Sequence, residues 1–222
     1  MPRPSKAQPV ARNDGSADAK LSRVSAGRLS LYLRCLEGWR RDGIATVSSA
    51  LLAETLGFSD AQVRKDIGFL GSLGQPGIGY KVQELSAAIR EALGINREWR
   101  TILIGVGNLA RALLRYQGFC EQGFRIVGLF DSDPSKIGQI IDGLPVRALA
   151  DVKPAVKSLA AELALLTVPA EAAQPVADVL CQAGIRGILN FAPTVLRLPT
   201  RVRLVNVDLA IQLEQLAFQV RG

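Results

Sequence analysis

Apolar residues in the first part of the chain recur with the period of amphipathic helices. One helix is predicted over 29–39, where apolar side chains stand three or four residues apart. A second, short helix follows Ser48 or Ser49, either of which can cap it, and Gly57 ends it in a left-handed conformation. Residues 1–20 show no apolar period, so we expect a flexible arm there.

A third helix is predicted over 60–73. Ser59 and Gln62 have the spacing of a capping box, in which the hydroxyl and the amide each satisfy one backbone N–H group. The buried stripe of this helix is formed by Val63, Ile67 and Leu70. Lys65 points away from the stripe, with Gln62 and Arg64 on its flanks. Two short helices joined by a tight turn, the second with a basic outer face, are typical of a helix-turn-helix that enters the major groove of DNA.

A glycine-rich hairpin over 74–81, which carries Tyr80 and Lys81, precedes a fourth helical pattern. Helices followed by a tight β-ribbon indicate a winged helix. The alternative is an ordinary helical domain whose charged face is only solvated.

After a polar link over 94–99 the pattern changes to alternating strands and helices. A continuous apolar run at 101–104 is typical of a buried parallel strand. Further strands are expected at 125–130, 163–168, 187–191 and 203–207. Helical patterns separate most of these strands. The alternation predicts an α/β domain with a Rossmann-type, doubly wound parallel sheet.

The first of these strands leads directly into a GxGxxA motif, formed by Gly105, Val106, Gly107, Asn108, Leu109 and Ala110. In a dinucleotide-binding turn the first glycine permits the tight turn, and the second lets the backbone approach the pyrophosphate. The small third residue keeps the helix close to the strand, and the N–H groups at the start of that helix face the phosphates. A strand before the motif and a helix after it therefore predict a dinucleotide site.

Asp131 ends the second strand, about 20 residues beyond the motif, where a carboxylate can bind the ribose hydroxyls of the adenosine. Ser132 follows, and no arginine stands beside it to receive a 2′-phosphate. We therefore expect NAD(H) rather than NADP(H), with Lys136 also among the cofactor-binding residues. The alternative is that Asp131 is only a turn or cap residue.

Two later strand ends are candidates for the same crevice, because ligands of open α/β sheets bind beyond the carboxyl ends of the strands. Their residues are Thr167, Val168 and Pro169 after one strand, and Asn190 and Phe191 after another. By periodicity alone these are equally well strand-to-loop turns.

The C-terminal segment over 208–220 carries an apolar stripe at helical spacing, formed by Leu209, Leu213, Leu216, Ala217 and Val220. We expect a helix that packs either on the core of its own subunit or on a partner subunit.

Composition narrows the function. The net charge is +7, with the basic excess mainly in residues 1–90, which favours a polyanionic partner. The chain has no histidine, which removes histidine metal sites and the Ser-His-Asp arrangement, so we expect neither a metal nor an enzyme.

The three cysteines, an odd number without a metal-ligand spacing, are expected to be reduced and in or near cores. Without a long apolar run or a secretory leader, the expected location is the cytoplasm.

Taken together, these segments resemble the Rex family of bacterial redox-sensing transcriptional repressors. The likeness covers roughly residues 25–220 and is carried by the stretches 32–34, 62–66, 77–80, 106–109, 130–131, 166–174, 187–193 and 206–208.

The resemblance implies a homodimer in which each subunit has a winged helix, a Rossmann domain and a C-terminal helix exchanged onto the partner. Such a repressor binds a palindromic operator when NAD⁺ dominates or the site is empty, and it releases that operator on binding NADH. On matching positions Arg64 and Lys65 are implied to read the major groove, with Tyr80 and Lys81 on the wing. We expect Ser59 and Gln62, at the start of the same helix, to be DNA-binding residues as well. Arg34, Tyr116 and Asp208 are implied to link the DNA-binding domain, the nucleotide pocket and the exchanged helix, and Leu209 to lie near the nicotinamide.

Two departures from the family pattern remove possible DNA contacts. The family usually continues the recognition helix with Ser-Tyr-Phe, where this chain has 68–70 as Gly-Phe-Leu, and the wing tip reads Gln-Pro at 75–76 in place of basic residues. We expect Arg3, Lys6 and Arg12 on the arm to compensate in part through phosphate contacts.

The expected division is an arm (1–20), a winged helix (21–95), a Rossmann domain (96–206) and a dimerisation helix (207–222). Two other functions fit the nucleotide motif. One is an NAD-dependent oxidoreductase with Lys136 or Tyr116 as proton donor, and the other is a module that binds another nucleotide, such as coenzyme A, without DNA.

Overall fold

The computed structural model describes residues 21–75 and 77–221, and the predicted arm lies outside the described residues. The chain divides into two compact units, the first ending at Gly94 and the second beginning at Ile95.

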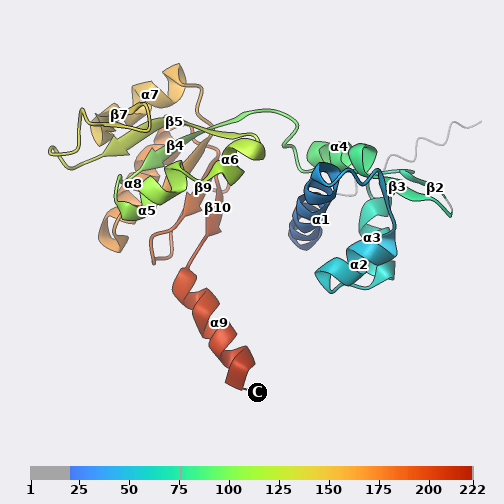
Figure 1. The fold of residues 1–222 in the computed structure, drawn as a ribbon. Helices are drawn as coiled ribbons and strands as arrows, with labels where there is room; N and C mark the ends of the chain where they lie inside the picture. Colours follow the sequence, from blue (N-terminus) through green and yellow to red (C-terminus); the bar gives the residue numbers. More distant parts are fainter. Residues whose placement is uncertain (1–20, 76, 222) are drawn as a thin grey trace, which may run out of the picture. The chain divides into compact units, whose positions relative to one another are not determined.

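The described part of the first unit consists of the helices α1 to α4 and a small antiparallel sheet (Figure 1). Its elements are α1 (Arg23–Arg41), β1 (Thr46–Val47), α2 (Ser49–Leu56), α3 (Asp60–Gly68), β2 (Gly74–Gln75), β3 (Gly79–Lys81) and α4 (Val82–Ala92). The strands lie in the order β1-β3-β2. Three helices followed by a hairpin that pairs with a short first strand form a winged helix, as the sequence pattern predicted.

Short polar side chains begin both helices of the helix-turn-helix. Ser48 caps α2 by accepting a hydrogen bond from the Leu51 N–H group at 3.1 Å, and Ser59 caps α3 by accepting one from Gln62 at 3.2 Å. Gly57, with φ of 69°, ends α2 in the predicted left-handed conformation.

Two predictions for α3 were wrong. The helix ends at Gly68 rather than Leu73, and the chain forms a turn at Phe69 and Leu70. Leu70 therefore lies outside the helix and is only half-buried. The reciprocal half of the capping box is also absent from the described hydrogen bonds of α3. The Gln62 side-chain N–H group donates to Asp66 Oδ1 at 3.0 Å, which orients the side chain along α3 rather than back toward the Ser59 N–H group.

The second unit is built on a seven-stranded sheet in the order β10-β9-β8-β4-β5-β7-β6. The strands are β4 (Trp99–Ile104), β5 (Phe124–Asp131), β6 (Ile140–Ile141), β7 (Leu144–Ala148), β8 (Leu163–Leu166), β9 (Gly187–Asn190) and β10 (Arg203–Asn206). Neighbouring strands are parallel except β6 and β7. The helices are α5 (Asn108–Leu114), α6 (Gln117–Glu121), η1 (Leu149–Asp151), α7 (Val152–Ser158), α8 (Ala170–Ala183) and α9 (Leu209–Arg221).

Strands β6 and β7 are additions that the apolar pattern did not predict. In β7 only Val146 is buried. Pro145 and Arg147 flank it, so the segment lacks a continuous apolar run. It becomes a strand through its parallel pairing with β5, in which Val146 stands opposite Leu129.

The sheet has a core on each face, as a doubly wound domain requires. Ile102 and Ile104 of β4 pack on one face with apolar residues of α7 and α8. Leu103 of the same strand packs on the other face with Ala110 and Leu113 of α5. Successive residues of β4 therefore enter opposite cores, which accounts for its continuous apolar run.

Helix α9 has no buried residue, although it is rich in apolar side chains. Leu213 is 66% exposed and Phe218 is 80% exposed. Figure 1 shows α9 (red) beyond the end of β10. Of the two expectations for this helix, packing on the core of its own subunit is therefore wrong.

Candidate functional site

The glycine-rich turn is held against a neighbouring strand end. Gly105 has φ of 89°, and a Cβ there would lie 2.8 Å from the Thr167 carbonyl oxygen. The Thr167 hydroxyl in turn donates to the carbonyl oxygens of Ile104 and Gly105, at 3.0 and 2.7 Å. The first glycine is therefore required both by its backbone conformation and by the close approach of β8.

Gly107 serves a different purpose. Its φ is −98°, and no heavy atom lies within 4 Å of the position that a Cβ would take. The space over this backbone is open, as a turn that admits a pyrophosphate needs. Ala110, one turn later, is fully buried and lets α5 lie close to the sheet.

The carboxylate of Asp131 lies beside the same turn and is 6% exposed. Its Oδ2 accepts hydrogen bonds from the Val106 N–H group at 2.7 Å and from Lys136 Nζ at 3.0 Å. Its Oδ1 accepts one from the backbone N–H group of Asp133 at 2.9 Å. Burial alone would raise the pKa of Asp131, but these hydrogen bonds and the Lys136 charge hold the pKa below its usual range. The group is an anion that retains acceptor capacity.

A cavity of about 770 Å³ opens beyond the carboxyl ends of β4, β5, β8 and β9. This size falls within the range of cofactor sites. Its lining includes ten predicted residues: Gly105, Gly107, Leu109, Asp131, Ser132, Lys136, Thr167, Val168, Pro169 and Phe191. The structure thus brings together four strand ends that are far apart in the sequence.

Other predicted residues do not line this cavity. Val106 and Ala110 are buried, Asn108 starts α5, and Leu209 is exposed on α9. The sequence pattern missed several lining residues, namely Ile104, Asp133, Leu149, Ala172, Pro175 and Val176. They belong to no motif, although the first turns of helices after β-strands are a general place to search.

Asn190 is buried and bonds within its own loop rather than facing the cavity. Its amide donates to the carbonyl oxygens of Ala192 and Thr194, and to Asn206 Oδ1 at 3.0 Å. Its own Oδ1 accepts the Ala192 N–H group at 3.0 Å. Asn190 therefore positions the loop that follows Phe191 and ties it to the end of β10.

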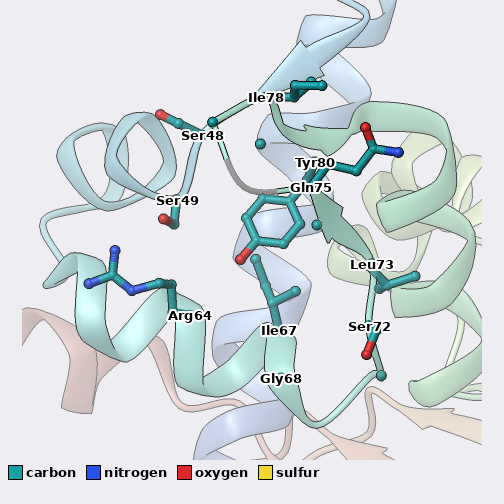
Figure 2. A pocket seen from close by; sticks show the side chains of 14 residues that line it. Ser48, Ser49, Arg64, Ile67, Gly68, Ser72, Leu73, Gln75, Ile78 and Tyr80 are labelled. Atoms are coloured by element: carbon teal, nitrogen blue, oxygen red, sulfur yellow. The ribbon is translucent and has the colours of Figure 1, made fainter.

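The first unit has a groove of about 620 Å³ between the wing and the helices α2 and α3. Figure 2 shows the Tyr80 ring in this groove, with Arg64 and Ser49 on its helical side and Ile78 on the wing. A Cβ at Gly74 would lie 2.8 Å from the Tyr80 ring, so this glycine lets the ring lie flat against the wing.

The predicted DNA-binding residues are distributed around the groove rather than gathered in it. Only Arg64 and Tyr80 line it. Arg64 forms an ion pair with Asp60, and Lys81 one with Glu84 at 2.7 Å. Ser59 is used as the cap of α3, and Gln62 and Lys65 line a second, smaller cavity of about 290 Å³.

The three predicted coupling residues lie on different elements. Arg34 is exposed on α1 of the first unit. Tyr116 is 49% exposed in the second unit and packs edge to face on Phe119, with 5.1 Å between ring centroids. Asp208 accepts hydrogen bonds from the first N–H groups of α9 and so begins that helix.

Other features limit the chemistry. In the described ranges no group of three or more acidic or cysteine side chains is placed to hold a metal ion. None of the helices between residues 21 and 221 is long and apolar enough to cross a membrane. Cys181 is buried and Cys35 half-buried, but Cys120 is exposed, so the expectation that all cysteines lie in or near cores was wrong for Cys120.

A winged helix joined to a Rossmann unit with a dinucleotide-type crevice defines the class of nucleotide-responsive DNA-binding regulators. Two family models match separate parts of the chain, "CoA binding domain" at residues 96–194 and "Putative DNA-binding protein N-terminus" at 20–67.

Curated relatives cover nearly the whole chain. The redox-sensing transcriptional repressor Rex of Carboxydothermus hydrogenoformans is 45% identical over 91% of this chain and 97% of its own. The redox-sensing transcriptional repressor Rex of Desulfitobacterium hafniense is 44% identical over 90% of this chain and 96% of its own. The chain belongs to the family of redox-sensing transcriptional repressors Rex.

Solved structures agree with this assignment. The Rex-family repressor RSP in complex with β-NAD⁺ and operator DNA superposes with a TM-score of 0.85 at 34% identity, covering 90% of this chain and 92% of that one. RSP in complex with β-NADH superposes with a TM-score of 0.82 at 32% identity, covering 90% and 94%.

Proposed function

We propose that the second unit binds NAD(H), that the first unit binds a palindromic DNA operator, and that NADH releases the operator. The observation that carries this proposal is the Asp131 carboxylate, which lies at the glycine-rich turn in the lining of the 770 Å³ cavity. A dinucleotide crevice on a chain with a winged helix supports coupling between nucleotide and DNA. Within this proposal the chain is divided into an arm (1–20), a winged helix (21–95), a Rossmann domain (96–206) and a dimerisation helix (207–222).

Three parts of the crevice have separate roles. Asp131 would accept hydrogen bonds from the ribose hydroxyls through its remaining acceptor capacity. Lys136 and the backbone N–H groups of Val106 and Asp133 hold the carboxylate in place. The open backbone at Gly107 would admit the pyrophosphate. Thr167 and the loop from Phe191, which Asn190 positions, would border the nicotinamide end.

On the DNA side, Lys65 and Arg64 project from α3, which we propose as the recognition helix. No described hydrogen bond or ion pair occupies Lys65, whereas Arg64 would exchange its bond to Asp60 for one to DNA. Tyr80 and Lys81 lie on the wing, where they would contact the backbone of the duplex.

We propose that α9 is covered by a second copy of the chain in a homodimer. Besides the predicted stripe, Ile211 and Phe218 are exposed on the opposite side of the helix. A helix that is apolar on two sides needs cover on both. A partner subunit that receives α9 would supply it, and would bring Leu209 toward the partner's crevice.

The regulatory step follows from linkage. NADH can expel DNA only if it binds the DNA-incompetent arrangement of the dimer more tightly than the competent one. Two recognition helices must match half-sites that lie a whole number of DNA turns apart. A change in subunit geometry therefore ends operator binding without unfolding either unit, and Arg34, Tyr116 and Asp208 are the proposed coupling residues.

We propose a regulator of the bacterial cytoplasm rather than an enzyme. Against an oxidoreductase, Lys136 is engaged by Asp131, and Tyr116 does not line the described cavity. A turnover assay with NAD⁺ and candidate substrates separates these functions. Against coenzyme A as the ligand, a carboxylate that accepts hydrogen bonds from ribose hydroxyls would repel the 3′-phosphate on the ribose of coenzyme A. Competition between coenzyme A and NADH tests that.

The direct experiment is fluorescence anisotropy of a labelled palindromic operator with the full chain, titrated separately with NADH and NAD⁺. We expect release by NADH at concentrations where NAD⁺ has little effect. DNA binding that ignores both nucleotides would contradict the sensor, and no DNA binding at low salt would contradict the repressor.

A further inference from the structure

A carboxylate is buried on the helix that we propose to read DNA. Asp66 lies near the end of α3 and is only 1% exposed. An isolated buried carboxylate is strongly unfavourable, so it persists only where hydrogen bonds and an opposite charge surround it. Its partners therefore show what holds α3 in place.

Most of those partners come from α1, more than thirty residues earlier in the chain. Arg28 donates to both carboxylate oxygens, from Nε at 2.5 Å and from Nη2 at 2.7 Å. The Tyr32 hydroxyl, one turn along α1, donates to Oδ2 at 2.9 Å. The fourth bond comes from Gln62 of α3 itself, at 3.0 Å.

The Asp66 carboxylate in this network is ionised. Burial alone would raise the pKa of Asp66, but the hydrogen bonds from Arg28 and Tyr32 hold it below the usual range. Burial raises the pKa of Tyr32, and its bond to Asp66 raises it further, so the hydroxyl stays protonated and donates. Both partners keep the protonation states that the network requires.

Directional bonds of this kind fix geometry more than they add stability. A buried ion pair contributes little net stability compared with apolar residues of similar size, because both charges lose their hydration. The two-pronged Arg28 bond and the Tyr32 bond approach the carboxylate from successive turns of α1, so they restrict both the rotation and the sliding of α3. Apolar contacts such as those of Val63 and Ile67 would tolerate either movement more easily.

We propose that Asp66 is a positioning residue that sets the orientation of α3 and thereby the operator specificity of the chain. The inference rests on the proposed function of α3. Lys65 is the neighbour of Asp66 in the sequence, so a rotation of α3 that breaks the network displaces its ammonium group from the base edges. Gln62, whose amide is committed to Asp66, belongs to this network rather than to the base-reading residues.

The test compares a palindromic operator, selected from random duplexes with the wild-type chain, with a scrambled duplex of equal length. The full-chain variants are Asp66→Asn, Tyr32→Phe, and the apolar pair Arg28→Met with Asp66→Leu. Dissociation constants come from fluorescence anisotropy at one salt concentration, and unfolding temperatures from circular dichroism. Ser86→Ala is the matched control, because Ser86 is a buried hydrogen-bonding side chain of α4 whose bond to Val82 lies outside α3.

We expect the apolar pair to fold, to keep its affinity for the scrambled duplex, and to lose at least tenfold in the operator-to-scrambled ratio. Tyr32→Phe removes a single hydroxyl, and we expect it to lower the ratio about threefold even if the apolar pair does not fold. Ser86→Ala should lower the unfolding temperature and leave the ratio unchanged.

An unchanged ratio in folded Tyr32→Phe and Asp66→Asn chains would overturn the inference while leaving the repressor function intact. A wild-type chain that shows no preference for any duplex would instead contradict the proposed function, and this inference with it.

Discussion

The carboxylate of Asp131 accepts a hydrogen bond from the backbone N–H group of Val106 at 2.7 Å. This bond ties the end of β5 to the glycine-rich turn after β4, two segments that a dinucleotide must contact at once. The ribose site and the pyrophosphate site are thereby held in a fixed relation before any nucleotide binds, which reduces the ordering cost of binding.

Replacement of Asp131 by asparagine should weaken NADH binding by about ten- to a hundredfold, since a hydrogen bond to a charged group is worth about 1.5–3 kcal/mol. The neutral side chain also loses its ion pair with Lys136. Isothermal titration calorimetry measures the affinity, and the operator should stay bound at NADH concentrations that release it from the wild-type chain.

Asp133→Asn is the control for that variant. Asp133 also lines the cavity, but its Oδ1 is engaged by the N–H and hydroxyl groups of Ser135. We expect an affinity within about threefold of wild type. If Asp133→Asn and Asp131→Asn were equally weak, the assignment of the ribose to Asp131 would be wrong.

Two glycines of one motif should respond differently to alanine. Gly105→Ala places a Cβ against the Thr167 carbonyl and strains a left-handed backbone, at a cost of about 1–3 kcal/mol or more. We expect its unfolding temperature to fall by several degrees. Gly107→Ala meets no neighbour, so it should unfold near the wild-type temperature and yet bind NADH at least tenfold more weakly. Unimpaired NADH binding by Gly107→Ala would count against the pyrophosphate assignment.

Dimerisation should depend on α9. Leu213→Asp with Leu216→Asp puts two charges on its exposed apolar stripe, and we expect monomers by analytical ultracentrifugation and loss of operator binding. Gln219→Asp adds a charge on a polar flank, between the predicted stripe and the side that carries Ile211 and Phe218, and should leave the dimer intact. A dimer that survives the double substitution would show that α9 is not the interface.

Operator and NADH affinities should change little between about pH 5.5 and 7. The chain has no histidine, and the pKa values of Asp66 and Asp131 are lowered in the folded protein. A lowered carboxyl pKa stabilises the fold above the unfolded value, about 3.9, and that contribution is lost only as the pH falls through the folded-state pKa. Acid unfolding should therefore begin below about pH 4 and be less steep in Asp66→Asn. A midpoint near pH 6 in anisotropy titrations would contradict this.

Lys65→Ala should lower operator affinity by about 1–3 kcal/mol if Lys65 contacts a base edge, and should relax the preference at that base pair. Lys153→Ala on α7, which removes an exposed lysine bonded to Gln182, is the charge-matched control. Equal losses in the two variants at the same salt would indicate that only net charge is being measured.

Local chemistry determined much of this protein directly from the sequence. Ser48 and Ser59 begin α2 and α3 because a short polar side chain satisfies N–H groups within its own turn. The position of Asp131 at a strand end, and the glycine turn before α5, likewise follow from spacing along the chain. The apolar pattern identified β4, β5, β8, β9 and β10, five of the seven strands in the sheet of the second unit.

Only the tertiary structure decided which distant segments meet. The burial of Asp66 depends on Arg28, 38 residues away, and the constraint on Gly105 depends on Thr167, 62 residues away. Strand β7 exists because β5 offers it an edge. Helix α9 is left exposed because the described part of its own chain does not cover its stripe. Periodicity shows that a face will be buried, but the packing partner is set by how the elements assemble, which the spacing within a single element does not encode.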